Sequence, residues 1–286
     1  MKKVIVTGIN GLIGQYISKP LEELGFEVFG IGTKSIKKSN YCSMDLNDHI
    51  KLENIFKEIK PEYLIHLAWD TKKGYLESET NFDLLYSSIK MLKYFKENGG
   101  KKTVFVGTCF EYKFKDTSLK ENDDLNPTTI YAKTKNYLRE MSELYSIKNN
   151  IDFCWGRVFY TYGDNENPNR LFPHIINSLK EDKKVSINYS QLKKDYIFAG
   201  DIAKSIALII DSNVNGIINL CTSNAISLEE IALTIAKKFN KINLLELKKL
   251  NTEEPKIIVG DNSRLVNEIG FKNFTTVGEW VNKYLN

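Results

Sequence analysis

Residues 3–14 read KVIVTGINGLIG, and this stretch decides the fold. The apolar run ends at Thr7, and glycines follow as Gly8, Gly11 and Gly14. Glycine permits a tight turn and lets backbone N–H groups at a helix start approach a phosphate, whose charge the helix dipole favours. The spacing G-x-x-G-x-x-G differs by one residue from the dinucleotide fingerprint G-x-G-x-x-G. We therefore predict a nucleotide-binding turn between a buried strand and a helix, with a plain turn as the alternative.

The alternation of strands and helices continues beyond this turn. Apolar runs near residues 27–32, 41–46, 63–69, 103–108 and 151–159 alternate with amphipathic helical patterns near 12–24, 48–59, 77–97 and 129–147. Such alternation is typical of a parallel sheet with helices on both faces. We predict an α/β protein with a Rossmann-like doubly wound parallel sheet over residues 1–162, completed by a strand near 216–221. Residues 163–286 are predicted to form mainly a smaller substrate-binding lobe over the carboxyl edge of the sheet, where ligands bind in such folds.

The composition excludes several classes of protein. Of 286 residues, 42% are hydrophobic and 27% are charged, and no stretch approaches the roughly 18 consecutive apolar residues that span a membrane. The net charge of +4, from 40 basic and 36 acidic residues, is too small to indicate nucleic-acid binding but suits an anionic small molecule. The start, MKKVIVTG, lacks a small-residue cleavage site, so we expect no signal peptide and a cytoplasmic protein.

The cysteines and histidines form no ligand pattern. The four cysteines are widely separated, without a Cys-x-x-Cys pair, and the three histidines share no ligand spacing. We therefore expect no metal site and no disulfide.

The end of the second apolar run indicates which cofactor fits. Thr33 and Lys34 are followed by Ser35, Lys37 and Lys38, and no carboxylate occurs before residue 45. An acidic residue here would accept hydrogen bonds from the adenosine ribose of NAD, whereas basic and hydroxyl groups suit the additional phosphate of NADP. The sequence therefore favours NADP(H) over NAD(H), with a solvated basic loop as the alternative.

Tyr131 and Lys135 lie four residues apart in YAKTK. On a helix this spacing places both side chains on one face, where the ammonium can stabilise a developing phenolate and make tyrosine usable as an acid or base. In isolation the pair also fits an ordinary surface contact.

Taken together, these motifs resemble the extended short-chain dehydrogenase/reductases that act on nucleotide sugars, the NAD-dependent epimerase/dehydratase family. The resemblance covers essentially the whole chain, and the motifs occur in the family's order and spacing. They are TGINGLIG (7–14), HLAW (66–69), GTCFEY (107–112), YAKTK (131–135), GRVFYTYG (156–163), NRLFP (169–173) and KKDYIFAGDIA (193–203).

The resemblance implies roles for individual residues. Tyr131 is expected to donate or accept the proton, Lys135 to bind the nicotinamide ribose and tune the tyrosine, and Thr108 to hydrogen-bond the reacting oxygen. Asp45 would sit near the adenine, and Ala68 along the cofactor. The full set expected at the cofactor is Gly8, Asn10, Gly11, Leu12, Ile13, Gly14, Thr33, Lys34, Asp45, Leu46, Leu67, Ala68, Tyr131 and Lys135.

The residues after Thr108 separate branches of this family. Relatives that eliminate water carry Asp-Glu there, whereas this chain has Cys109 and Phe110. Relatives that epimerise at C-3 and C-5 carry a cysteine one position later and a histidine where this chain has Arg170. C-4 epimerases usually have an acidic end to the second strand. We expect an NADPH-dependent reductase that acts on the C-4 ketone of a nucleotide-linked 4-keto-6-deoxy or 3,6-dideoxy sugar, resembling the reductases of the paratose and abequose type.

The expected substrate contacts and partners complete this interpretation. The alternatives to this reductase are a 4-epimerase with tightly bound NAD and a non-catalytic NADP-binding sensor.

Apolar stripes on the helices near 77–97 and 129–147 fit core packing or a homodimer interface, and the resemblance favours the homodimer. Glu111 is expected to take no part in the chemistry. The residues expected at the substrate are Thr108, Cys109, Phe110, Tyr160, Arg170 and Lys194, of which Arg170 and Lys194 would hold the diphosphate.

Overall fold

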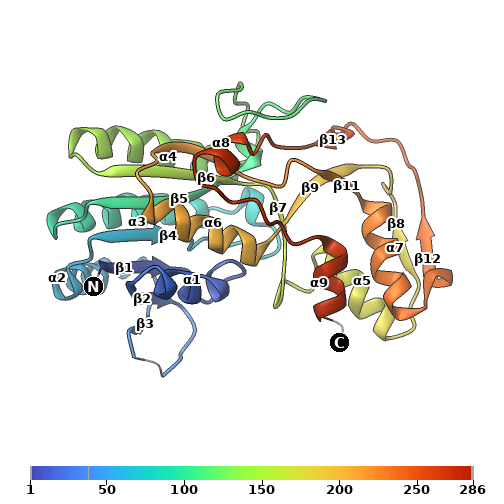
Figure 1. Ribbon diagram of the computed structural model, residues 1–286, viewed down its shortest axis with the longest axis horizontal. Helices are drawn as coiled ribbons and strands as arrows, with labels where there is room; N and C mark the ends of the chain where they lie inside the picture. Colours follow the sequence, from blue (N-terminus) through green and yellow to red (C-terminus); the bar gives the residue numbers. More distant parts are fainter. Residues whose placement is uncertain (1, 38, 285–286) are drawn as a thin grey trace.

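A parallel sheet forms the centre of the computed structural model, which describes residues 2–37 and 39–284 (Figure 1). Among the described residues its seven strands follow the order β10-β6-β5-β4-β1-β2-β3, and each neighbouring pair is parallel. The strands are β1 (Lys2–Thr7), β2 (Phe26–Gly32), β3 (Tyr41–Ser43), β4 (Tyr63–His66), β5 (Lys102–Thr108), β6 (Asp152–Val158) and β10 (Gly216–Leu220). The strand predicted near 216–221 is thus β10, which completes the sheet beside β6.

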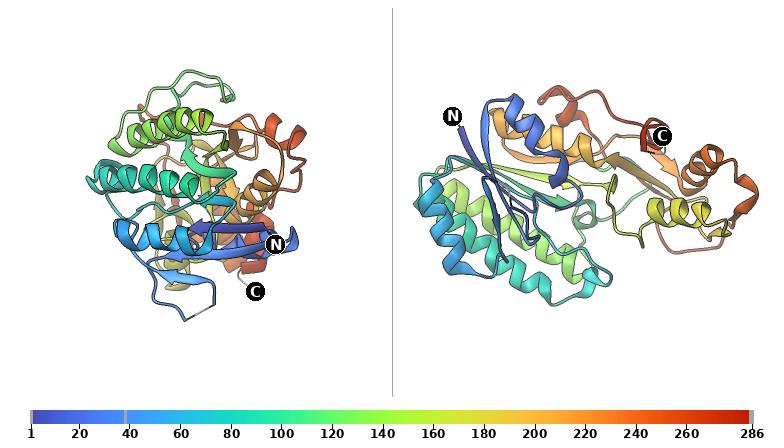
Figure 2. Two further views of the ribbon diagram at one scale, coloured as in Figure 1. Left: turned by 90° about the vertical axis from the view of Figure 1, so that its left-hand side faces the viewer. Right: turned by 90° about the horizontal axis from the view of Figure 1, so that it is seen from below.

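Helices cover both faces of this sheet (Figure 2). On one face α1 (Ser18–Glu23) and α6 (Ala199–Asp211) share a core with β1 and β5. On the other face lie α2 (His49–Ile59), α3 (Thr80–Glu97) and α4 (Ile130–Lys148), which share a second core with the same strands. The predicted doubly wound α/β fold is therefore confirmed.

Two predicted helices begin differently from the sequence pattern. Where a helix is predicted near 12–24, the structure has a 3-10 turn, η1 (Gly14–Tyr16), followed by the short α1. The helix starts late because the glycine turn continues up to the first helical residues. The pattern near 77–97 likewise starts with a 3-10 turn, η2 (Tyr75–Glu77), before α3 begins at Thr80. Both differences lie at the edge of the sheet where the strands end.

The smaller lobe lies beyond the carboxyl ends of the strands (Figure 1). Its main sheet follows the order β11-β9-β13 with β7 paired to β9, and its helices enclose a separate apolar core. Three elements that follow residue 163 in sequence pack with the large sheet, namely α6, β10 and α8 (Ser263–Asn267), so the predicted boundary divides the two lobes in space only in part. The lobe elements are β7 (Tyr160–Tyr162), α5 (Leu171–Lys180), β8 (Val185–Ile187), β9 (Lys193–Phe198), β11 (Ala225–Ser227), α7 (Leu228–Phe239), η4 (Ile242–Leu244), β12 (Leu245–Leu247), β13 (Ile257–Ile258) and α9 (Val277–Tyr284).

The strand order reverses between β1 and β4, and this position fixes where a ligand can bind. The chain leaves β1 toward β2 on one side, whereas β4 leads to β5 on the other, so the connections that follow the two strands diverge and leave a crevice above their paired ends. Thr7 and His66 end the two strands and are joined by a 2.7 Å hydrogen bond between Oγ1 and Nδ1. Over the part of the chain that the structure describes, no helix is long and apolar enough to cross a membrane.

Candidate active site

The glycine turn packs so closely that side chains would not fit. Gly8 has φ of 71°, in the left-handed region, and a Cβ there would lie 2.6 Å from the backbone nitrogen of Ala68. A Cβ at Gly14 would collide with the carbonyl oxygen of Gly8. Gly11 lies exposed at the tip of the turn. The predicted turn between strand and helix is present, and its backbone stands at the crevice between β1 and β4.

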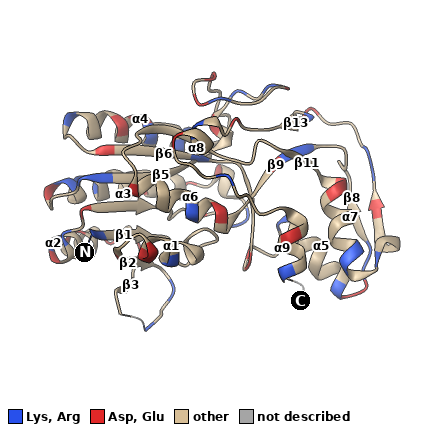
Figure 3. Ribbon diagram, in the orientation of Figure 1, with Lys and Arg blue, Asp and Glu red and all other residues tan. Residues whose placement is uncertain are grey.

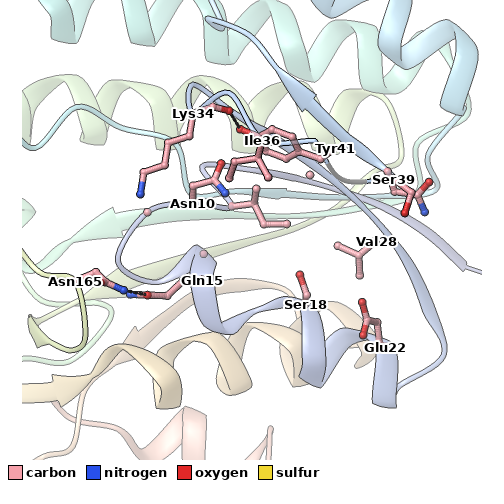
Figure 4. Close-up of a pocket in the computed structure, with 15 residues that line it drawn as sticks. Asn10, Gln15, Ser18, Glu22, Val28, Lys34, Ile36, Ser39, Tyr41 and Asn165 are labelled. Carbon is pink, nitrogen blue, oxygen red and sulfur yellow. Dashed lines mark hydrogen bonds between the residues drawn. The ribbon is translucent and has the colours of Figure 1, made fainter. Parts of the chain in front are cut away.

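A cavity of about 430 Å³ opens beside this turn (Figure 4). Asn10, Gly11, Lys34 and Tyr41 line it, and the Tyr41 hydroxyl donates a 2.5 Å hydrogen bond to the Lys34 carbonyl. The Asn10 Oδ1 atom is buried and has no hydrogen-bond partner among the described residues. A dinucleotide fits this site, because the turn offers backbone N–H groups to phosphate, Asn10 offers an unused acceptor to a hydroxyl, and Lys34 offers a cation.

The loop between β2 and β3 supplies the positive charge at this cavity, through Lys34, whereas Glu22 of α1 lines it as an acid. Thr33, Lys34 and Lys37 are exposed, and the loop carries lysine without any aspartate or glutamate (Figure 3). Lys38, which also supported the NADP interpretation, lies outside the described residues. The local charge agrees with the NADP interpretation, which stays a prediction.

The other residues expected at the cofactor surround the same crevice. Asp45 is exposed, and its carboxylate accepts a 2.9 Å hydrogen bond from the Asn47 backbone. Ala68 follows β4, and its backbone nitrogen donates to Thr7 Oγ1 over 3.4 Å. Leu46 is buried, whereas Leu12, Ile13 and Leu67 are half-buried.

Thr108 and Tyr131 meet where β5 ends and α4 begins. The Thr108 hydroxyl accepts a 3.3 Å hydrogen bond from the Phe110 backbone, which starts the 3-10 turn η3 (Cys109–Glu111). The Thr129 hydroxyl caps α4 by accepting from the Ala132 backbone over 3.1 Å, which places Tyr131 in the first helical turn. Burial raises the pKa of Tyr131, and its contact with the Thr108 hydroxyl opposes this in part. The phenol is therefore protonated at neutral pH.

Lys135 lies on the same buried face of α4 as Tyr131, as the four-residue spacing predicts. Its ammonium donates a 2.8 Å hydrogen bond to the Val106 carbonyl and lies 3.6 Å from the centroid of the Trp69 ring. Burial lowers the pKa of Lys135 to about 7, although the nearby Glu111 carboxylate acts to raise it. A lysine of this kind can gain or lose its charge near neutral pH.

Three residues expected at the substrate, Phe110, Tyr160 and Lys194, line a second cavity of about 530 Å³. Phe110 and Tyr160 pack edge to face with ring centroids 5.9 Å apart. The Lys194 ammonium donates to the Tyr160 hydroxyl over 3.2 Å and pairs with Glu254 at 2.7 Å. Thr129, two residues before Tyr131, also lines this cavity.

Arg170 and Cys109 occupy different surroundings. The Arg170 guanidinium lies 5.2 Å from the centroid of the Tyr75 ring, which in turn lies 4.9 Å from that of Tyr131. Tyr75 therefore lies between Arg170 and Tyr131. Cys109 is 2% exposed and packs in a core cluster with Tyr112, and its burial raises the pKa of the thiol. Direct contact between Cys109 and a substrate stays a prediction.

Sequence reasoning missed four side chains that shape the site. Trp69 stands in the quoted HLAW motif, which is the signal that could have identified it. Tyr75 and Glu254 lie in segments without apolar periodicity, so nothing local pointed to them. The fourth is Glu111, whose Oε1 accepts a 2.9 Å hydrogen bond from the Thr108 backbone.

A glycine turn at the crevice of a doubly wound sheet, with Thr108, Tyr131 and Lys135 at the neighbouring strand end, defines an oxidoreductase of the short-chain dehydrogenase/reductase type that uses NAD(P). Residues 4–221 match the model of the NAD dependent epimerase/dehydratase family. This match spans well over half of the chain, so the protein belongs to that family. The family resemblance and the enzyme class expected from the motifs are confirmed.

Known proteins similar to this chain agree with that membership. The chain is 25% identical over 236 residues to dTDP-6-deoxy-L-talose 4-dehydrogenase (NAD(+)) of Aggregatibacter actinomycetemcomitans. The aligned region covers 79% of this chain and 86% of the relative. It is 26% identical to GDP-6-deoxy-D-talose 4-dehydrogenase of the same organism, with 94% of this chain and 91% of the relative covered. The fold is similar to that of a UDP-glucose 4-epimerase from Thermus thermophilus in complex with NAD, with TM-score 0.86, 19% identity and 99% of both chains covered.

Proposed function

We propose that this protein reduces the C-4 ketone of a nucleotide-linked 4-keto-6-deoxy or 3,6-dideoxy sugar with NADPH, in the biosynthesis of deoxysugars for surface polysaccharide. The observation that carries the proposal is the buried, protonated Tyr131, which contacts Thr108 and lies on one helix face with Lys135. Two relatives named as 4-dehydrogenases of 6-deoxy sugar nucleotides support this choice of substrate, because reduction at C-4 is the reverse of that reaction.

The side chains divide the proton chemistry among them. The nicotinamide, when bound, supplies the hydride to the ketone carbon. Negative charge then develops on the carbonyl oxygen, to which Tyr131 gives its phenolic proton while the Thr108 hydroxyl donates a hydrogen bond. The Lys135 ammonium stabilises the phenolate that forms on Tyr131. Burial keeps the phenol protonated before the reaction, so the proton is available, but it also disfavours the phenolate, which is why the Lys135 charge is needed.

The walls of the second cavity support a deoxysugar linked to a diphosphate. Phe110, Phe114 and Ile258 give it an apolar side, which suits a methyl group at C-6 better than a hydroxymethyl group. Lys194 also lines this cavity and offers a cation there, and a diphosphate would replace Glu254 as its partner.

Two other functions remain as alternatives. A nucleotide-sugar 4-epimerase would retain tightly bound NAD and interconvert its substrate without net consumption of cofactor. A non-catalytic NADP-binding sensor would not need Thr108, Tyr131 and Lys135 together, so their joint presence in one site argues against it.

A direct assay tests the proposed reaction. The absorbance of NADPH is followed after addition of freshly generated dTDP-, CDP- and GDP-linked 4-keto-6-deoxy sugars. We expect oxidation of NADPH with one of them and the formation of a 4-hydroxy product. If no cofactor is consumed with any of the three, or a UDP-hexose is epimerised instead, the proposal is wrong.

The preference for NADPH is proposed from the basic loop at the first cavity. Replacing Lys34 with alanine is expected to weaken NADPH binding about 10-fold to 100-fold and to change NADH binding little, because a charge-assisted contact to phosphate contributes about 1.5–3 kcal/mol. Both affinities are measured by titrating the fluorescence of the reduced nicotinamide. Lys57→Ala, the same change on the remote helix α2, is the control. Equal losses for NADPH and NADH would contradict the preference.

We also propose a homodimer, formed through α3 and α4. Six large apolar side chains on these helices are more than half exposed in the single chain, which is unusual for a monomer. They are Phe82, Tyr86, Tyr137, Met141, Leu144 and Ile147. The cytoplasmic location expected from the sequence stays a prediction.

Replacing Leu144 with glutamate is expected to shift this dimer to monomer at micromolar concentration. In a twofold interface the new charge occurs on both copies, so it is desolvated twice. Sedimentation velocity measures the change, and Ile242→Glu, on a 47% exposed residue of the other lobe, is the control. A dimer that survives Leu144→Glu but not Ile242→Glu would place the interface elsewhere.

A further inference from the structure

The indole ring of Trp69 covers the ammonium of Lys135. The Lys135 Nζ atom lies 3.6 Å from the ring centroid, well inside the roughly 6 Å within which a ring face attracts a cation. The ammonium also donates a hydrogen bond to the Val106 carbonyl, at 2.8 Å. Lys135 is 4% exposed, so both contacts act away from water, where they are strongest.

A single buried amide fixes the position of that indole ring. The Trp69 Nε1 atom donates a 2.8 Å hydrogen bond to Asn81 Oδ1, and Asn81 is 1% exposed. The Asn81 amide nitrogen donates to the carbonyls of Tyr75 and Ser78, each over 2.7 Å. Asn81 thus ties the ring over Lys135 to the backbone of Tyr75, whose own ring packs against the catalytic Tyr131.

We propose that Trp69 is a positioning residue that holds the Lys135 side chain in place as an ammonium, ready to bind the cofactor ribose and to stabilise the Tyr131 phenolate. The proposal rests on the function proposed above for Lys135. Among the described residues, this ring and the Val106 carbonyl are the two groups that contact the ammonium with favourable geometry for a cation.

Of the other titratable groups around Lys135, one carries a negative charge and the rest are neutral, so the ammonium depends on the Trp69 ring and the Val106 carbonyl for further stabilisation. Glu111 of η3 attracts the ammonium, whereas His66 of β4 is kept neutral because burial and the nearby lysine lower its pKa. Tyr131, one helical turn away, stays a neutral phenol because burial raises its pKa. Burial acts against the ammonium, so an apolar side chain without a ring face at position 69 lowers the pKa of Lys135 further.

The first test observes the contact without any substrate. Tryptophan fluorescence of the cofactor-free protein is followed from pH 5 to pH 9. We expect a step centred near pH 7 that is lost in Lys135→Met, where Trp69 is intact but no ammonium titrates. Trp69→Phe shows what the other two tryptophans contribute. A step that persists unchanged in Lys135→Met would overturn the proposal.

The second test follows cofactor binding as a function of pH. NADPH affinity is expected to fall at high pH, as Lys135 loses its proton. In Trp69→Leu the midpoint of this fall should lie about 0.5 to 1.5 pH units lower than in the unaltered protein. Above the midpoints of both proteins, the variant should therefore bind NADPH about 3-fold to 30-fold more weakly. Trp69→Tyr retains a ring face and should restore most of the shift. It also serves if Trp69→Leu does not fold.

The outcomes separate this inference from the proposed function. If affinity falls equally at every pH in Trp69→Leu and Trp69→Tyr, the ring has only a packing role and the inference is wrong. If both tests behave as expected but no 4-keto sugar is reduced, the role of Trp69 stands and the proposed reaction fails.

Discussion

Replacing Tyr131 with phenylalanine is expected to lower kcat/KM for the proposed ketone substrate by about 100-fold to 10,000-fold while leaving NADPH affinity nearly unchanged. Removal of a positioned general acid costs this much because the proton must then come from water. The loss corresponds to about 3–5 kcal/mol in the barrier. The phenol is 9% exposed and has the Thr108 hydroxyl beside it, so water cannot easily replace the missing proton donor.

The same change elsewhere provides the control for Tyr131→Phe. Tyr94 lies half-buried on α3, outside both cavities, so Tyr94→Phe should retain full activity. Stopped-flow absorbance of NADPH under single-turnover conditions separates the chemical step from product release. If Tyr131→Phe reduces the ketone as fast as the unaltered protein, another group supplies the proton and the assignment fails.

The fold could be predicted because its signals are local. The apolar runs of β1, β4, β5 and β6 mark strands buried on both faces. The glycines at the end of β1 are required by contacts within a few residues of the turn or with the adjoining strand end. The Tyr131 and Lys135 pair was equally accessible, because helical geometry alone places residues four apart on one face.

The remainder of the site depends on contacts between distant segments. Trp69 and Lys135 are far apart in sequence, as are Lys194 and Glu254, and only the packing of strands and loops brings each pair together. No periodicity records such pairing. Trp69 lies inside the HLAW motif, so the sequence could place it near the site but could not predict that it contacts Lys135.

Glu111 has a structural role that its local sequence did not indicate. It was expected to take no part in the chemistry, and it is absent from the residues that line the two cavities. Its carboxylate instead accepts hydrogen bonds from the Thr108 backbone at 2.9 Å and from Trp155 Nε1 at 3.0 Å, and pairs with Arg157 Nε at 2.7 Å. The parallel register of β5 and β6, which sets Gly107 beside Arg157, makes that pairing possible.

Replacing Glu111 with alanine is therefore expected to destabilise the protein by about 3–5 kcal/mol, because it leaves the Arg157 guanidinium buried without its counter-ion. Both side chains are essentially inaccessible to water, at 0% and 1% exposure, so no solvent can take over the role of the carboxylate. Urea denaturation followed by far-UV circular dichroism measures the loss, and the melting temperature should fall on the order of 10 °C. Should the alanine variant fail to fold, Glu111→Gln retains an acceptor for Thr108 and tests the charge alone.

A matched substitution in an exposed ion pair separates the effect of burial from the effect of removing a carboxylate. Glu53 pairs with Lys57 at 2.5 Å on α2, but its side chain is 36% exposed, so Glu53→Ala should cost about 0.5 kcal/mol or less. A cost for Glu111→Ala no larger than that for Glu53→Ala would mean that the buried pair contributes nothing. The expected difference would show instead that the buried ion pair between η3 and β6 stabilises the fold at the segment whose backbone also holds Thr108.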